Sequence, residues 1–211
     1  MRNARAPCFR IMHFALCMAS IAGYSLLELM FAAALSVTLG AIAAPLLLAA
    51  VDDVRAAGAV RYVSTRLQQA RMEAVGRSAD VGVQFVQTPD GYAYTVYVDG
   101  NGNGVRTRDI QGGLDQRLGS VERLPYHFAG VDFGVQAGLP PVDAGGAAPG
   151  TDPIKLGSSS ILTFTALGTS SSGSLYLRGR RSSQYVIRIL GETGKTRVLK
   201  FDPRAQHWRP S

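Results

Sequence analysis

Residues 20–51, SIAGYSLLELMFAAALSVTLGAIAAPLLLAAV, contain a single charged side chain, that of Glu28. From Tyr24 to Val51 this run exceeds the roughly 20 apolar residues that span the hydrocarbon core of a bilayer. The preceding flank has no acidic residue and three arginines: Arg2, Arg5 and Arg10. Because positively charged flanks stay in the cytoplasm, we expect everything after Val51 to face the periplasm or the cell exterior.

The helical pattern continues past the apolar span to about Arg77. Apolar side chains recur with the 3-4-3-4 spacing of one helix face, while most arginines fall on other faces. The apolar positions are Val60, Val63, Leu67, Ala70 and Ala74. Residues 52–77 are therefore expected to form an amphipathic continuation of the helix that packs on a globular head, residues 78–211.

Beyond Arg77 the helical period disappears and strand patterns replace it. Residues 81–87 and 92–98 predict a hairpin around the turn PDG, and residues 184–190 and 195–201 predict a second hairpin around GETG. Further strands are expected in three segments: residues 126–135, 161–167 and 174–177. A polar stretch runs up to Glu122, and residues 138–150 are expected to be a flexible loop. The predicted fold class is α+β, with one long N-terminal helix packed on an antiparallel sheet.

Two motifs resemble catalytic or nucleotide sites but lack essential members. His127 and His207 are far apart in sequence, with no accompanying catalytic motif, so we expect them to be packing or surface residues. The run GETGKT ends like a phosphate-binding loop, but Ile189 stands where that loop requires glycine. We expect a hairpin turn there and predict neither an enzyme nor a bound cofactor.

The loop DGNGNG offers oxygen ligands at Asp99, Asn101 and Asn103, as a calcium loop does. The twelfth position, which should supply a bidentate glutamate, is Ile110. An Asx-rich turn is the expected structure, and no metal site is predicted. Both cysteines precede the apolar span, so the head has no thiol for a disulfide or a metal.

Charge is distributed unevenly along the chain. Residues 79–152 carry nine acids against four arginines, whereas residues 178–211 carry nine basic residues against two acids, a local net charge of 9 − 2 = +7. Such a cluster fits contact with a polyanion or an acidic partner, and it also fits a basic surface that only confers solubility.

Residues 23–29, GYSLLEL, resemble the processing site of type IV prepilins and pseudopilins. The resemblance implies that a prepilin peptidase cuts after Gly23 and methylates the new N-terminus, Tyr24. Residues 1–23 would then be a leader peptide and residues 24–51 the transmembrane helix.

The same resemblance gives Glu28 and Pro45 roles in assembly. A carboxylate inside a membrane is costly and normally has a partner or a function. By resemblance, Glu28 pairs with the terminal amine of a neighbouring subunit during filament assembly. Pro45 matches the proline common in these stalks, which removes one backbone hydrogen bond and kinks the helix.

An alternative cleavage remains open at the N-terminus. The leader is apolar from Ile11 to Ala22, whereas pilin leaders are usually short and polar, and its SIA sequence is a pattern that ordinary signal peptidase cleaves. Met12 and Met18 are alternative start positions. A separate alternative for Glu28 is the carboxylate of an uncleaved signal anchor, which reaches the membrane interface.

Three segments of the head resemble the minor pseudopilins grouped as GspH/FimT: LQQARMEAVGRSADVGVQF (67–85), YVDGNGNGVR (97–106) and LTFTALGTSSSGSLYL (162–177). The resemblance implies a pilin-like structural subunit at the tip or priming complex of a type II secretion system or a type IV pilus. It implies a single-pass protein of the bacterial inner membrane with its head in the periplasm. The implied partners are other pilins or pseudopilins, the assembly platform, prepilin peptidase and inner-membrane lipid.

The sequence GKTR, residues 194–197, resembles the G-R-x-R motif with which DNA-uptake minor pilins of the FimT type grip DNA. The alternative function is therefore a minor pilin that binds extracellular DNA through its phosphates, independently of sequence. The candidate contacts are Arg178, Arg180, Arg181, Lys195, Arg197 and Lys200. Tyr185 and Trp208 are candidates for stacking on single-stranded bases.

Overall fold

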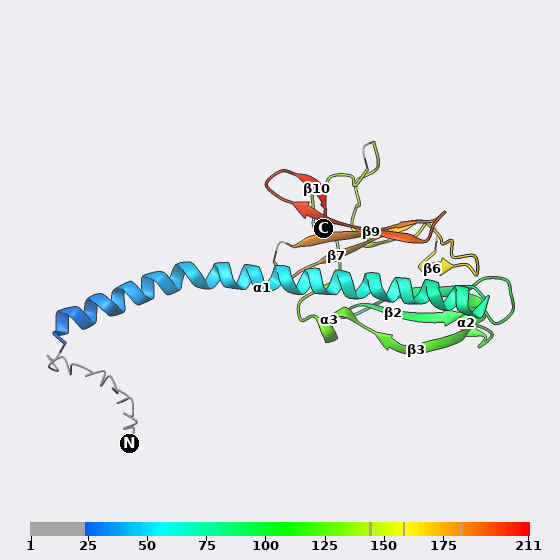
Figure 1. Cartoon of the computed structure of the whole chain (residues 1–211), viewed down its shortest axis with the longest axis horizontal. Coiled ribbons are helices and arrows are strands. Elements are labelled where there is room, and N and C mark those ends of the chain that lie inside the picture. The colour runs from blue at the N-terminus through cyan, green and yellow to red at the C-terminus, as the bar shows by residue number, and fades with distance from the viewer. Residues whose placement is uncertain (1–23, 144, 158, 182) are drawn as a thin grey trace, which may run out of the picture. The chain divides into compact units, whose positions relative to one another are not determined.

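The computed structural model describes residues 24–143, 145–157, 159–181 and 183–211 (Figure 1). The chain divides into two compact units, Met1–Ala44 and Pro45–Ser211. We call residues 52–211 of the second unit the head. In chain order the elements are α1 (Leu26–Arg77), β1 (Val81–Thr88), β2 (Gly91–Val98), α2 (Thr107–Gln111), β3 (Gln116–Glu122), α3 (Leu124–His127), β4 (Asp132–Phe133), β5 (Ile154–Lys155), β6 (Ile161–Phe164), β7 (Gly173–Arg178), β8 (Gln184–Leu190), β9 (Lys195–Asp202) and β10 (His207–Pro210).

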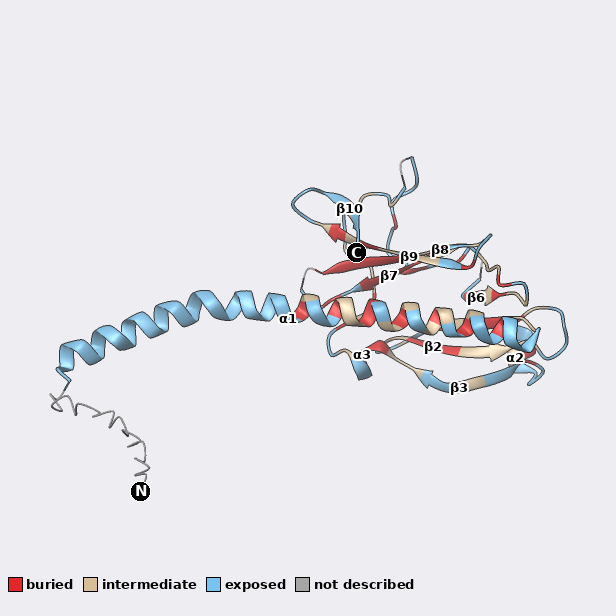
Figure 2. Cartoon of the chain, in the orientation of Figure 1, coloured by how far each residue is buried: buried red, intermediate tan, exposed pale blue. Residues whose placement is uncertain are grey.

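Helix α1 changes character along its length. Every residue from 24 to 51 is exposed, whereas one stripe of the helix is buried from Asp52 onward (Figure 2). The five positions of the predicted apolar stripe are all buried: Val60, Val63, Leu67, Ala70 and Ala74. The predicted end of the helix at Arg77 is also confirmed.

The predicted fold class, α+β with a long N-terminal helix packed on antiparallel β-structure, is confirmed, and the head divides this β-structure into two sheets. The first has the strand order β3-β2-β1-β6, and the second has the order β10-β9-β8-β7-β4 with β5 also paired to β7. In Figure 1, β2 and β3 of the first sheet lie on one side of the second part of α1, and β7 and β9 of the second sheet lie on the other. A single core joins the buried stripe of α1 to apolar residues of both sheets, among them Phe85, Phe164, Leu175 and Ile187.

Both predicted hairpins are present, but the region between them differs from expectation. Residues 91–98 pair with 81–88, and residues 195–200 pair with 185–190. The strand expected at residues 126–135 was wrong, because α3 occupies its beginning and only Asp132–Phe133 is extended. Pro125 lies in the first turn of α3, and Gly130 has φ +82, which interrupts an extended run.

Helix α2 and three strands, β3, β5 and β10, were not predicted. Strand β3 lies at the edge of the first sheet, and most of its side chains are exposed, so it lacks the alternation that reveals a half-buried strand. The loop at residues 138–150 was expected to be flexible, but its described part covers the second sheet. Val142 and Trp208 pack on a cluster formed by Tyr176, Val186 and Leu199, and the Trp208 indole donates a hydrogen bond to the Pro140 carbonyl at 3.1 Å.

Replacing Leu67 with alanine should lower the free energy of unfolding by about 2–5 kcal/mol, because a cavity would open in the shared core. The Leu67 side chain is 1% exposed, whereas that of Met72 on the same helix is 73% exposed. Met72→Ala should therefore change the free energy by less than about 0.5 kcal/mol. Urea unfolding of the full-length chain in detergent, followed by near-ultraviolet circular dichroism, measures both. Equal losses of stability in the two variants would contradict the burial of Leu67 in the core.

Candidate functional site

Of the two residues assigned to processing, Tyr24 lies just before α1, and Gly23 lies outside the described residues. Of the two assigned to assembly, Glu28 lies in the first turn of α1 and Pro45 lies further along it. Tyr24 and Glu28 are both exposed in the single subunit. The backbone N–H of Glu28 donates to Ser25 Oγ at 3.2 Å. Serine followed three residues later by glutamate is the capping-box pattern of a helix start. The sequence carried this signal for the helix start at Leu26, and the sequence analysis missed it.

Pro45 lies inside α1, and the helix continues on both sides of it. The boundary between the two compact units falls at this residue. Because proline lacks a backbone N–H, one hydrogen bond of the helix is missing there. The kink expected at Pro45 stays a prediction.

Within the head, Asp52 binds α1 to the turn between β7 and β8. Asp52 is only 5% exposed. Its carboxylate accepts hydrogen bonds from the backbone N–H groups of Arg180 at 2.8 Å and Arg181 at 3.0 Å. Buried charges require such donors. A Cβ at Gly179 would lie 2.8 Å from Asp52 Oδ2, so this close approach requires glycine.

Asp53, the next residue, makes a different set of contacts. Its carboxylate lies 2.6 Å from the Lys200 ammonium and accepts the hydroxyl hydrogens of Ser183 at 3.2 Å and Tyr185 at 3.3 Å. Partial burial raises the pKa of Asp53, but the hydrogen bond and charge of Lys200 outweigh it, so the pKa lies below its usual value. Burial lowers the pKa of Lys200, yet the same pairing leaves that pKa above its ordinary value.

The two aspartates were not identified from the sequence. They follow the apolar span directly, and their partners come from the basic C-terminal region, with a sequence separation of 128 between Asp52 and Arg180. The sequence nevertheless contained a signal for these contacts. Two adjacent acids follow the apolar helix, and the basic residues that could pair with them gather in the C-terminal region.

The structure divides the six basic candidates for DNA contact into separate places. Three are exposed at the end of β7 and in the following turn: Arg178, Arg180 and Arg181. Two are exposed at the start of β9: Lys195 and Arg197. Arg178 pairs with one end of β8, and Lys195 pairs with the other end. Six residue steps of β-strand separate these ends, which is about 20 Å.

The remaining candidates for nucleic-acid contact are engaged within the head. Lys200 forms the ion pair with Asp53 on the side of the sheet that faces α1. Tyr185 is 2% exposed, so it cannot stack on a base. Trp208 packs against Tyr176 and Phe201, with ring centroids 6.1 Å and 5.4 Å away. The stacking hypothesis for Tyr185 was therefore wrong, and Trp208 is a packing residue.

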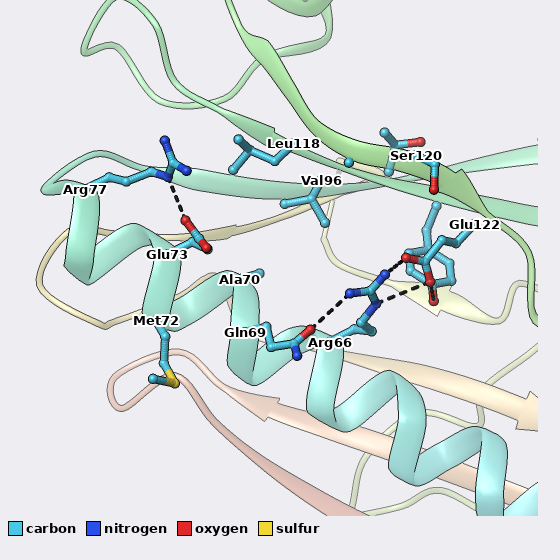
Figure 3. A pocket seen from close by; sticks show the side chains of 13 residues that line it. Arg66, Gln69, Ala70, Met72, Glu73, Arg77, Val96, Leu118, Ser120 and Glu122 are labelled. Carbon is cyan, nitrogen blue, oxygen red and sulfur yellow. Dashed lines mark hydrogen bonds and ion pairs between the residues drawn. The ribbon is translucent and has the colours of Figure 1, made fainter.

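A groove of about 520 Å³ lies between α1 and strands β2 and β3 (Figure 3). Near one end of it, Glu122 forms an ion pair with Arg66 and accepts the hydroxyl hydrogens of Tyr62 and Tyr94, each at 2.7 Å. Burial raises the pKa of Tyr94 well above its usual value. These contacts fasten α1 to the edge strand, and the acids drawn here are paired with arginines.

The residues weighed for metal and catalytic chemistry have structural roles. The carboxylate of Asp99 accepts the backbone N–H groups of Asn101, Gly102 and Gly104, which confirms the Asx-rich turn. The ring of His127 lies 5.2 Å from that of Tyr62. Within the residues that the structure describes, no group of three or more His, Cys, Asp or Glu side chains is placed to hold a metal ion.

A long N-terminal helix, apolar at its start and packed in its second part on antiparallel sheets, defines a pilin-like subunit. Residues 59–194 match the family model of Type II transport protein GspH, and the chain belongs to this family. The chain is also similar to the minor pseudopilin EpsH from the Type 2 Secretion System of Vibrio cholerae, with 17% identity and a TM-score of 0.43. That match covers 69% of this chain and 97% of EpsH. No curated protein matches the sequence.

Asp52→Ala should destabilise the head by about 2–3 kcal/mol, because two backbone N–H groups lose a charged acceptor. The control is Asp90→Ala, which removes an acid whose side chain is 80% exposed and 3.6 Å from Arg123. The control should change the free energy of unfolding by less than about 0.5 kcal/mol. Urea unfolding of the two full-length variants measures both free energies. If Asp52→Ala lowered the free energy of unfolding no more than the control does, the hydrogen bonds of Asp52 to the β7–β8 turn would not stabilise the head.

Asp53→Asn should lower the free energy of unfolding at neutral pH by less than about 1 kcal/mol, since its ion pair with Lys200 is partly exposed. Folding lowers the pKa of Asp53. Its contribution to the free energy of unfolding is therefore fully present when the pH lies above the pKa in the unfolded chain, about 3.9, and it disappears as the pH falls through the lower pKa of the folded protein. Folding raises the pKa of Lys200, so the pairing also weakens when the pH rises through that pKa.

The measurement is urea unfolding of wild type and Asp53→Asn at a series of pH values. The difference between the two should be constant around neutrality, should begin to decline at about pH 4 and should vanish once the pH lies below the lowered pKa of folded Asp53. Glu192→Gln, a change at an exposed turn residue, serves as the control and should show no such pH-dependent difference. A difference that grows toward acid pH would contradict the assignment.

Proposed function

We propose that this chain is a minor pseudopilin, a structural subunit of the periplasmic filament of a type II secretion system. It is made as a precursor, cut by prepilin peptidase after Gly23 and N-methylated at Tyr24. The first part of α1 crosses the inner membrane, and the head lies in the periplasm. The subunit joins the tip or priming complex of the filament, where its partners are other pseudopilins and the assembly platform.

The observation that carries the proposal is the exposed, apolar first part of α1 with its single carboxylate. Within the described residues, α1 is the one helix long and apolar enough to cross a membrane. Among the residues that the structure describes, Glu28 forms no ion pair. A free amine at Tyr24 of a neighbouring chain supplies the missing positive charge. Family membership over residues 59–194 supports type II secretion as the system.

The positions of the basic residues weigh against the alternative of a DNA-binding minor pilin. The basic residues of that hypothesis are separated by the length of β8, and Lys200 is engaged with Asp53. A structural role without catalysis fits the arrangement, because the charged groups described above fasten α1 to the sheets. We therefore retain filament assembly as the function.

Glu28→Gln should reduce incorporation into the filament by about tenfold or more, because an amine left unpaired in the membrane forfeits at least about 1.4 kcal/mol. The measurement compares sheared filaments with membranes by immunoblot, in a secreting strain that lacks the native copy. The N-terminal peptide is examined by mass spectrometry in the same samples, where cleavage after Gly23 should give a chain that begins at methylated Tyr24.

Ser36→Ala is the matched control. Ser36 is exposed on the same helix, and its hydroxyl donates only to the Ala32 carbonyl of its own helix, at 2.8 Å. The control variant should enter filaments like wild type. Normal incorporation of the Glu28→Gln chain would overturn the pairing, and a mature chain that begins at Gly23 would overturn processing by prepilin peptidase.

A further inference from the structure

We propose that the turn between β7 and β8 binds the phosphate groups of anionic phospholipids at the periplasmic surface of the inner membrane. The binding groups are the guanidinium groups of Arg178, Arg180 and Arg181. The inference rests on the proposed function in one respect, because it requires α1 to be anchored in a bilayer. It adds a second, electrostatic contact between the head and the membrane.

The depth of the turn follows from contacts within the head. Leu46, Leu47 and Leu48 belong to the same compact unit as the turn, and they are 67%, 65% and 54% exposed. Asp52 comes four residues after Leu48, a rise of about 6 Å along the helix. The backbone N–H of Arg180 lies 2.8 Å from the Asp52 carboxylate. The turn is therefore held about one helical turn beyond an exposed cluster of leucines.

The polar headgroup layer on each side of a bilayer is roughly 5–8 Å thick. When the three leucines lie at the edge of the hydrocarbon core, the turn lies within that layer. The hydrogen bonds of Asp52 to Arg180 and Arg181 involve backbone N–H groups, so they fix this depth and leave both guanidinium groups available. Guanidinium is well suited to phosphate, which it can bind with two parallel hydrogen bonds.

The three arginines of the turn make no ion pair with the acids that the structure describes, and an electrostatic attraction links Arg178 to the nearby Asp132 carboxylate. The two nearest acids of α1 are already engaged, Asp52 by backbone N–H groups and Asp53 by Lys200. A third acid, Asp132, pairs in register with Arg178, and its carboxylate accepts the N–H groups of Phe133 and Tyr92.

The position of this cluster distinguishes lipid from DNA as its partner. An exposed apolar helix segment next to three cations is the pattern of an interfacial site, in which apolar burial and attraction to anionic lipid act together. A site for DNA needs no such segment. Lys195 and Arg197 lie at the other end of β8, beside the single exposed leucine Leu190 and not beside the apolar span of α1. They carry the same charge as the pair Arg180 and Arg181 and provide a matched comparison with it.

The test uses the full-length chain reconstituted in vesicles that contain phosphatidylcholine and phosphatidylglycerol. Electron spin resonance with spin-labelled lipids measures the preference of the protein for phosphatidylglycerol over phosphatidylcholine. Each arginine near an anionic surface changes the equilibrium constant for lipid binding by up to about fivefold. The measured preference changes less, because it is an average over all lipids in contact with the protein. We expect Arg180→Gln with Arg181→Gln to lower the preference about twofold or more.

Three comparisons accompany this measurement. Lys195→Gln with Arg197→Gln removes the same charge and should leave the lipid preference unchanged, and Arg180→Lys with Arg181→Lys should largely retain it. In wild type, raising NaCl from about 0.05 to about 0.5 M should weaken the preference, a readout that requires no variant. Labelled single-stranded and duplex DNA is titrated into the same vesicles.

An equal lipid preference in wild type and in Arg180→Gln with Arg181→Gln would overturn the inference. It would equally be overturned if that variant lost DNA binding while the lipid preference stayed unchanged, since the cluster would then be a DNA site. Flotation with vesicles of phosphatidylcholine alone tests the anchor separately. A chain that fails to float contradicts the proposed function as well, whereas a chain that floats without the preference contradicts only the lipid contact.

Discussion

Burial of one stripe of α1 against two sheets is the interaction on which the rest of the head depends. Each sheet turns one apolar face toward the helix, and these two faces contribute to the same core as Val60, Val63 and Leu67. Without the helix, the two apolar faces would lose the element that they share. The ion pair of Arg66 with Glu122 and the contacts of Asp52 hold the helix at the edges of this core, where it meets β3 and the β7–β8 turn.

The elements with long, regular periodicity were predictable from the sequence. The buried stripe of α1 and the two hairpins rest on local patterns of apolar residues, and the structure confirms them. The division into two sheets was not predictable in the same way, because it depends on pairing between distant strands, such as Val81 with Phe164. Strand β3 has mostly exposed side chains, so its sequence carried no alternating signal.

The interaction residues show the same limit. The roles predicted for Tyr24 and Glu28 rest on a short local motif, whereas the contacts of Asp52 depend on a turn 128 residues later in the chain. The basic residues of the C-terminal region are close in sequence and were treated as one group. Arg178 lies near the β7–β8 turn, at the start of β8, whereas Arg197 lies near the β8–β9 turn, at the end of β8. Because the strands are antiparallel, these two turns lie at opposite ends of the sheet.

Asp52 and Asp53 show how adjacent residues of a helix acquire separate functions. Successive side chains point about 100° apart around a helix, so one carboxylate enters the interface with the turn while the other faces Lys200 at its border. The buried carboxylate binds backbone groups, whose position does not depend on the identity of the side chains in the turn. Exposed side chains there are consequently free to serve a surface, while the backbone that carries them stays fixed to α1. The partly exposed pair of Asp53 with Lys200 adds less stability but reinforces the same junction from the second sheet.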